Sequence, residues 1–238
     1  MPIFPETNTT DAPWTRAGAG NAEEGLDPEM VMPRSSARRV PVQVDLVFAI
    51  DRTGSSHEFA VGIRQAIPMI ARPVIEKAAR VRLFLQTHGD LDYNEHPVML
   101  VRDGGLDDIV TAAQHLSFGG GGDPPEHHAH ALETALECVD WGGVPPKSRG
   151  AIVLFSTADT KASPSGRTAQ QIGQALAARG VLLFAVSQLE PGVNALIDAA
   201  HGMAFPISNE PSVAEMQRIA SRVAASVTDS IIQGMSQA

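Results

Sequence analysis

Short apolar runs alternate with longer amphipathic segments from residue 40 onward. The apolar runs predict strands at 42–50, 80–86, 97–102, 151–155, 181–186 and 204–207. The amphipathic segments predict helices at 55–79, 106–116, 125–139, 168–178, 193–200 and 212–232. Strands that alternate with helices are typical of an α/β fold. We therefore expect a doubly wound, Rossmann-like, mostly parallel sheet of six strands with helices on both faces.

The predicted helix at 55–79 contains two prolines, Pro68 and Pro73. Each proline ring removes a backbone hydrogen-bond donor and clashes with the preceding turn. We therefore expect this segment to be kinked or divided.

Residues 1–39 show neither a helical nor an alternating apolar period. This stretch is rich in proline and also contains several glycines. Such a composition predicts an irregular or disordered N-terminal tail, followed by one domain over residues 40–238.

Composition and charge exclude several classes of protein. Hydrophobic residues make up 43% of the chain and charged residues 19%, as in ordinary globular α/β proteins. The net charge of −9 argues against a nucleic-acid-binding protein, which would carry a basic surface. No apolar stretch reaches the ~18 residues that suggest a membrane-spanning helix. Because Cys138 is the single cysteine, no internal disulfide can form, and we expect a cytoplasmic protein.

Three oxygen-bearing side chains follow the unbroken apolar run 46–50 at alternate positions: Asp51, Thr53 and Ser55. Gly54 between them allows the chain to turn. Hard oxygen donors on a loop at the C-terminal end of a parallel strand suit a small hard cation such as Mg²⁺. With one carboxylate and two neutral hydroxyls, the ion would retain positive charge and attract a further anion.

Three further segments follow in an informative order. They are His-Gly-Asp at 88–90, Gly-Gly-Gly-Gly-Asp-Pro-Pro-Glu at 119–126, and an apolar strand that ends in Ala158 and Asp159. Together with the first motif, they resemble the metal-ion-dependent adhesion site of von Willebrand factor A (vWA) domains, in the branch with Asp-x-Thr-Gly-Ser. The resemblance covers about residues 40–227. It implies that the short strand at 97–102 is an antiparallel edge strand.

The resemblance also implies a set of metal ligands from three loops: Asp51, Thr53, Ser55, Asp123 and Asp159. Thr53 and Ser55 would contact the ion directly, whereas Asp51 and Asp159 would act through water. Thr157 would face the metal in place of Asp159 if the register of the third loop shifted by two residues. Lys161 would pair with Asp159 or weaken cation binding.

We therefore expect a protein-interaction module rather than an enzyme. Mg²⁺, with Mn²⁺ or Ca²⁺ as substitutes, would bind an Asp or Glu side chain of a partner protein, with no role for nucleic acid or a membrane. The resemblance implies an adaptor or regulator of bacterial type, with an AAA+ ATPase or another component of a multi-protein system as the partner. Specificity would come from side chains around the site, for which the candidates are His57, Glu58, Asp90, Asp92, Tyr93 and Lys161.

Three alternatives remain open from the sequence. The first is a vWA scaffold with a degenerate metal site, which binds partners without metal. The second is a Mg²⁺-dependent phosphotransfer enzyme with Asp51 as nucleophile, since residues 51–55 also resemble the phosphorylated-aspartate motif of P-type ATPases. The third is zinc binding by His127 and His130, which lie three residues apart on one helical face.

Overall fold

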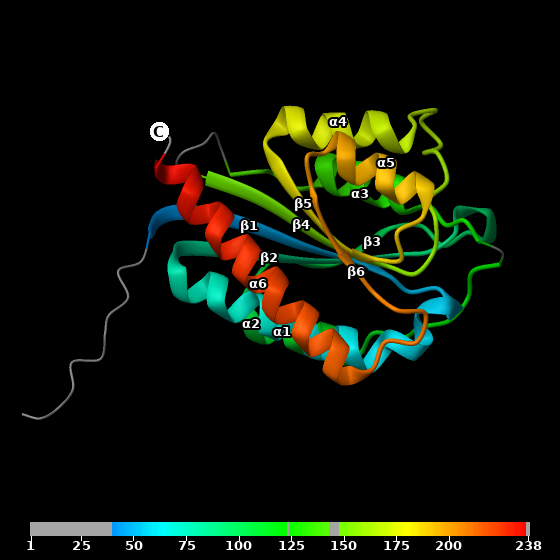
Figure 1. Ribbon diagram of the computed structural model, residues 1–238, viewed down its shortest axis with the longest axis horizontal. Helices are drawn as coiled ribbons and strands as arrows, with labels where there is room; N and C mark the ends of the chain where they lie inside the picture. Colours follow the sequence, from blue (N-terminus) through cyan, green and yellow to red (C-terminus); the bar gives the residue numbers. More distant parts are fainter. Residues whose placement is uncertain (1–39, 123, 143–147, 237–238) are drawn as a thin grey trace, which may run out of the picture. The chain divides into compact units, whose positions relative to one another are not determined.

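A six-stranded sheet forms the centre of the computed structural model, which describes residues 40–122, 124–142 and 148–236 (Figure 1). The strand order is β3-β2-β1-β4-β5-β6. The strands are β1 (Val40–Asp51), β2 (Ala78–His88), β3 (Val98–Gly104), β4 (Ser148–Ser156), β5 (Val181–Ser187) and β6 (Met203–Pro206). β3 is antiparallel to β2, and all other neighbours are parallel. The predicted fold class, including the antiparallel edge strand, is confirmed.

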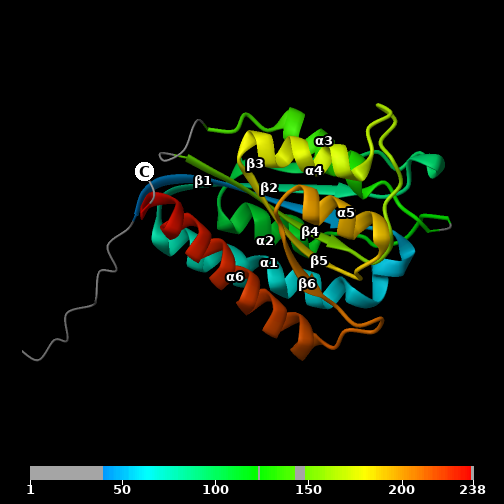
Figure 2. The ribbon, with the colours of Figure 1, turned by 45° about the horizontal axis from the view of Figure 1, so that its top comes forward.

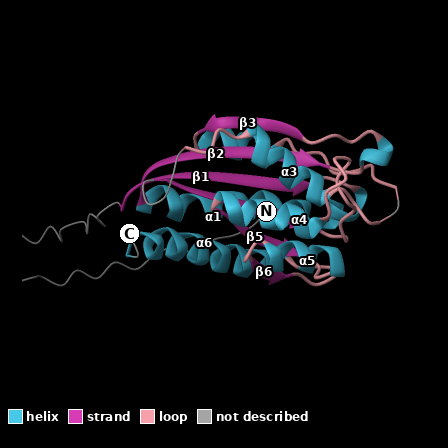
Figure 3. Cartoon of the chain, turned by 90° about the horizontal axis from the view of Figure 1, so that it is seen from above, coloured by secondary structure: helices cyan, strands magenta, loops and turns pink. Residues whose placement is uncertain are grey.

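Helices cover both faces of the sheet (Figures 2 and 3). The helices are α1 (Ala60–Lys77), α2 (Leu106–Gln114), α3 (His128–Cys138), α4 (Ala169–Arg179), α5 (Pro191–Ala199) and α6 (Val213–Ser236). Two short 3-10 helices, η1 (Gly54–Phe59) and η2 (Leu91–Tyr93), follow β1 and β2. α1, α2 and α6 pack on one face of the sheet, and α3, α4 and α5 pack on the other.

The side chains of β1 alternate between the two hydrophobic cores. Leu46 and Phe48 belong to the core under α1, α2 and α6, whereas Val47 and Ala49 belong to the core under α3, α4 and α5. All four are fully buried. Because the strand is covered on both faces, its sequence is a continuous apolar run rather than an alternating one.

Helix α1 continues through both prolines, so the expected division at Pro68 or Pro73 is wrong. Its N-terminal end does differ, because residues 54–59 form η1 instead. The two prolines are only partly buried, whereas Ile67 and Ile70 on the inner face are fully buried. Burial of this apolar face keeps the helix continuous, since most helical stability in proteins comes from tertiary packing.

Helix α3 begins at His128, three residues later than the sequence predicts. Pro124 and Pro125 have no backbone N–H to donate. Glu126 instead bridges to the loop after β4, where its N–H donates to the Asp159 carbonyl and its carbonyl accepts from the Lys161 N–H. The bridge places the Glu126 side chain next to the ends of β1 and β4.

The helices of the described residues include none that is both long enough and apolar enough to cross a bilayer. The predicted tail at 1–39 lies outside the described residues.

Candidate functional site

A pocket of about 430 Å³ opens at the C-terminal ends of the parallel strands. Its lining comes from four segments: the loop after β1, the glycine loop before α3, the loop after β4 and the loop after β5. β1 and β4 are neighbours, although β2 and β3 come between them in the chain. The pocket therefore lies at the switch point of the sheet, where ligands bind in open α/β folds.

Asp51, the last residue of β1, is fully buried behind the pocket, and both of its carboxylate oxygens accept hydrogen bonds. Its Oδ1 accepts from the backbone N–H of Thr53 at 2.9 Å and from the Thr53 hydroxyl at 2.7 Å. Its Oδ2 accepts from the hydroxyls of Ser56 at 3.0 Å and Thr157 at 3.3 Å. One carboxylate thus accepts hydrogen bonds from hydroxyls of two loops and holds them together.

The hydroxyls in front of Asp51 form a continuous chain. The Thr53 and Ser55 oxygens are 3.1 Å apart, and the Ser55 and Thr157 oxygens are 2.8 Å apart. Ser56, for which the sequence suggested no role, lies 3.1 Å from the Thr157 hydroxyl. Thr53 and Ser55 meet as the motif predicts, and Thr157 is the side chain that joins them from the third loop.

Asp159 lines the same pocket, but its carboxylate has other partners. Its Oδ1 accepts from the backbone N–H groups of Thr160 at 2.8 Å and Val193 at 3.0 Å. Val193 lies in the first turn of α5, where a carboxylate satisfies free N–H groups and the helix dipole. Gly192 permits this approach, since a Cβ there would lie 2.6 Å from Oδ1. Asp159 therefore stabilises the start of α5, and within the described part of the chain its carboxylate makes no hydrogen bond to Asp51, Thr53 or Ser55.

The glycine loop crosses the loop after β1. The Gly119 N–H donates to the Arg52 carbonyl at 2.8 Å, and the Gly54 N–H donates to the Gly120 carbonyl at 3.0 Å. Gly120 and Gly121 have φ values of 91° and 70°, a region that favours glycine. Asp123, the ligand predicted on this loop, lies outside the described residues.

Glu126 is a pocket residue whose role was not predicted. It is 4% exposed, and its Oε2 is buried without a hydrogen-bond partner. Burial, together with the negative charges of Asp51 and Asp90, raises the pKa of Glu126 to about 7. The final position of the glycine-rich motif was the only sequence signal for this residue. An unpartnered carboxylate oxygen in a pocket favours a bound cation.

Two buried histidines lie behind Asp51. His88 Nε2 and His128 Nδ1 are 2.9 Å apart, and both residues are fully buried. Burial lowers the pKa of both, that of His88 to about 3, so both imidazoles are neutral at pH 7. For Asp51, burial opposes ionisation, but the positive charge that His128 and His88 carry when protonated at low pH and the hydrogen bonds from Thr53 outweigh it. The pKa of Asp51 is therefore held below its ordinary value, and its carboxylate is ionised.

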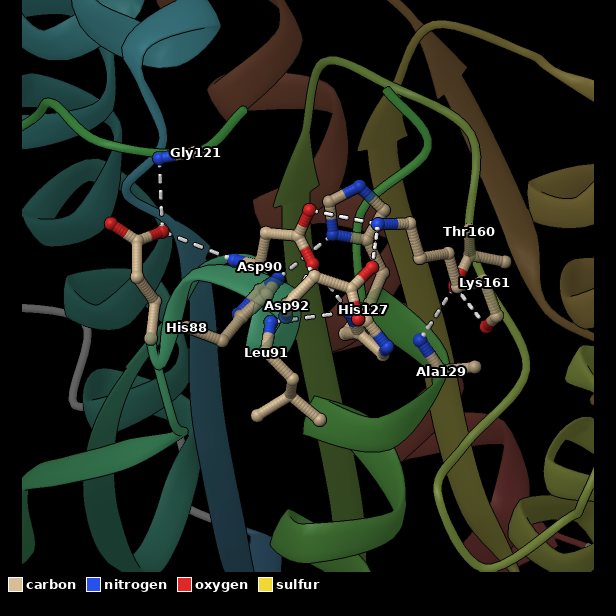
Figure 4. Close-up of polar contacts among 11 residues, drawn as sticks. His88, Asp90, Leu91, Asp92, Gly121, His127, Ala129, Thr160 and Lys161 are labelled. Atoms are coloured by element: carbon tan, nitrogen blue, oxygen red, sulfur yellow. Dashed lines mark hydrogen bonds and ion pairs between the residues drawn. The ribbon is translucent and has the colours of Figure 1, made fainter. Parts of the chain in front are cut away.

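A polar cluster beside the pocket contains three of the predicted rim residues (Figure 4). The Lys161 ammonium donates to Asp90 Oδ2 at 2.8 Å and to Asp92 Oδ2 at 2.5 Å. The predicted pairing of Lys161 with Asp159 is therefore wrong. Asp90 closes the turn after β2 by accepting from the Asp92 N–H, and it is fully buried. It therefore cannot contact a partner protein. The ligand atoms of Asp90, Asp92 and His127 lie within 4.8 Å of one another, so these residues form a possible metal group.

The remaining rim candidates are on the surface. Tyr93 is 53% exposed, and the side chains of His57 and Glu58 are 70% and 79% exposed. None of these three lines the pocket. They remain candidates for contact with a partner around it.

The two histidines of the zinc alternative have different neighbours. His127 Nδ1 lies 2.9 Å from Asp90 Oδ1, whereas His130 Nδ1 lies 3.1 Å from the Ser163 hydroxyl. Over residues 40–122, 124–142 and 148–236, the possible metal group contains His127 without His130.

Comparison with known proteins identifies the fold. No protein-family model and no curated protein sequence matches the chain. Its structure is similar to the crystal structure of the SpRpn10 VWA domain, with a TM-score of 0.57 and 15% sequence identity. The similarity covers 75% of this chain and 93% of that chain. This likeness, together with the strand order, shows that the chain has the vWA-domain fold.

Proposed function

We propose that this chain is a metal-dependent protein-interaction module rather than an enzyme. Mg²⁺, or Mn²⁺ or Ca²⁺ in its place, would be held by Asp51 and the hydroxyls of Thr53, Ser55 and Thr157. The observation that carries the proposal is the hydroxyl chain in front of Asp51, which joins two distant loops at the floor of an open pocket. Hard cations prefer such oxygen ligands.

The residues present fit a divalent cation. The ionised Asp51 supplies negative charge, and Glu126, which lines the pocket, has a buried Oε2 without a hydrogen-bond partner. Thr157 replaces Asp159 in our proposed ligand set, because the Asp159 carboxylate is engaged by backbone N–H groups. Asp123 stays in the set from the sequence resemblance.

The proposed partner is a protein that presents an Asp or Glu side chain. Asp51 supplies one negative charge and the hydroxyls of Thr53, Ser55 and Thr157 supply none, so an ion held by these four side chains would attract a carboxylate from outside. The second carboxylate, that of Asp123, would lower this attraction. The vWA resemblance suggests an AAA+ ATPase or another component of a multi-protein system as the source of that carboxylate. The bound metal ion would act as the Lewis acid that accepts the partner carboxylate. This chain would orient the hydroxyl ligands and shape the pocket.

The ligand set is tested by a pair of substitutions on the third loop. Thr157→Val should weaken Mg²⁺ binding by at least about tenfold, because it removes an oxygen while keeping the side-chain shape. Asp159→Asn should leave Mg²⁺ affinity within about twofold, because the amide oxygen can still accept from α5. Isothermal titration of metal-stripped protein measures both. The opposite result, with loss only in Asp159→Asn, would restore the ligand set of the sequence prediction.

The partner prediction needs a second experiment. A partner captured in Mg²⁺ should be released by a chelator and should not be retained by Ser55→Ala protein. Substitution of one partner Asp or Glu by its amide should abolish the same interaction. A partner that binds equally well without metal and to Ser55→Ala protein would identify a vWA scaffold with a degenerate metal site.

A further inference from the structure

We propose that Lys161 is a tethered cation that fills a second cation position, formed by Asp90, Asp92 and His127. This position lies beside the pocket and uses none of the residues proposed to hold Mg²⁺. The inference therefore stands or falls independently of the proposed function.

The three ligand residues come from two segments of the chain that the fold brings together. Asp90 and Asp92 belong to the turn after β2, and His127 precedes α3. Their ligand atoms lie within 4.8 Å of one another, a spacing that allows all three to contact one ion. Two carboxylates and an imidazole are a ligand set that suits Mn²⁺, Co²⁺ or Zn²⁺.

A positive charge already occupies this position. Lys161 reaches it from the loop after β4, and its Nζ lies 2.8 Å from Asp90 Oδ2 and 2.5 Å from Asp92 Oδ2 (Figure 4). Asp90 is fully buried, and a buried carboxylate requires a compensating charge. Burial opposes the charge of Lys161, but the two carboxylates outweigh it and raise the pKa of Lys161 above its ordinary value. The ammonium thus supplies the compensating positive charge that a metal ion would otherwise supply.

The charge balance leaves this position incompletely neutralised. One ammonium faces the carboxylates of Asp90 and Asp92, and Glu126 is close enough for the charges of Asp90 and Lys161 to act on it. A divalent ion would match the two carboxylates better. Lys161 nevertheless holds the position, because a tethered group binds at a high effective concentration.

The tether has a structural consequence. Lys161 joins the loop after β4 to the turn after β2, and Glu95 Oε2 joins that turn to the glycine loop by accepting from the N–H groups of Asp90 and Gly121, each at 3.1 Å. The loop after β4, the turn after β2 and the glycine loop are therefore held together without metal. The unmodified protein, which retains Lys161, should therefore bind metal only in the pocket.

The test is the number of ions bound by lysine variants in a Ser55→Ala background, in which the proposed Mg²⁺ site is disabled. Lys161→Met removes the amine but keeps most of the apolar stem, and Lys161→Ala removes both. Each variant should bind one Co²⁺ or Mn²⁺ ion more than the Ser55→Ala parent, with a dissociation constant of about 1 mM or lower. Equilibrium dialysis counts the ions, and the Co²⁺ absorption spectrum reports the nitrogen ligand.

Two further variants separate this site from non-specific binding. Lys161→Arg retains a cation and should bind no additional ion. Addition of Asp92→Asn to Lys161→Met should abolish the additional ion. Folded Lys161→Met and Lys161→Ala proteins that bind no more metal than their parent would overturn the inference. If either variant is destabilised, its melting temperature should rise with Co²⁺, and an unchanged melting temperature would count equally against the inference.

Discussion

Asp51→Ala is expected to abolish Mg²⁺ binding and to lower the free energy of unfolding by about 2–4 kcal/mol. The loss of stability follows from the hydrogen bonds that Asp51 accepts, two from Thr53 and one each from Ser56 and Thr157. Without the carboxylate, the Thr53 N–H would lose its acceptor at a buried position, and the hydroxyls would keep only their bonds to one another. Calorimetric titration measures the affinity for Mg²⁺, and urea denaturation measures the stability.

Asp51→Asn separates the two effects. The amide keeps one acceptor oxygen and the shape of the side chain but removes the negative charge. We expect Mg²⁺ affinity to fall by about 100-fold or more while the protein stays folded. Asp229→Asn, an exposed carboxylate change in α6, is the matched control and should alter neither property. Unchanged Mg²⁺ affinity in folded Asp51→Asn protein would refute the proposed metal site.

Glu126→Gln is expected to stabilise the metal-free protein at pH 8 and to have little effect at pH 4. The pKa of Glu126 is about 7 in the folded protein, against an ordinary value of 4.5. The contribution of the protonated side chain is fully present below pH 4.5 and is lost as the pH rises through 7. At pH 8 the ionised carboxylate therefore costs stability, by about 2–3 kcal/mol. The amide never ionises, so the variant avoids this loss.

Urea denaturation at several pH values, in the presence of a chelator, measures the predicted difference. Glu190→Gln is a suitable control, since Glu190 lines the same pocket but is exposed. Its stability should follow that of the unmodified protein across the pH range. If Glu126→Gln and the unmodified protein lose stability in parallel between pH 5 and pH 8, Glu126 does not carry the raised pKa.

The pattern of apolar residues was sufficient to predict the sheet and most of its helices. The run 46–50 is apolar at every position because helices cover both faces of β1. That burial is a property of the whole fold, but it leaves a local pattern that can be read directly. The start of α3 was predicted incorrectly because the bridge between Glu126 and the loop after β4 joins residues far apart in the chain.

The same distinction applies to the candidate site. Asp51, Thr53 and Ser55 are close in the chain, so their spacing alone placed their oxygens together. Whether Thr157 or Asp159 joins them depends on the path of the loop after β4. It also depends on α5, whose Val193 N–H donates to Asp159. The sequence thus determined the fold class and the local motif, because both depend on residues close in the chain. The tertiary structure alone decided the partners of Thr157, Glu126 and Lys161, because their neighbours come from separate strands and loops.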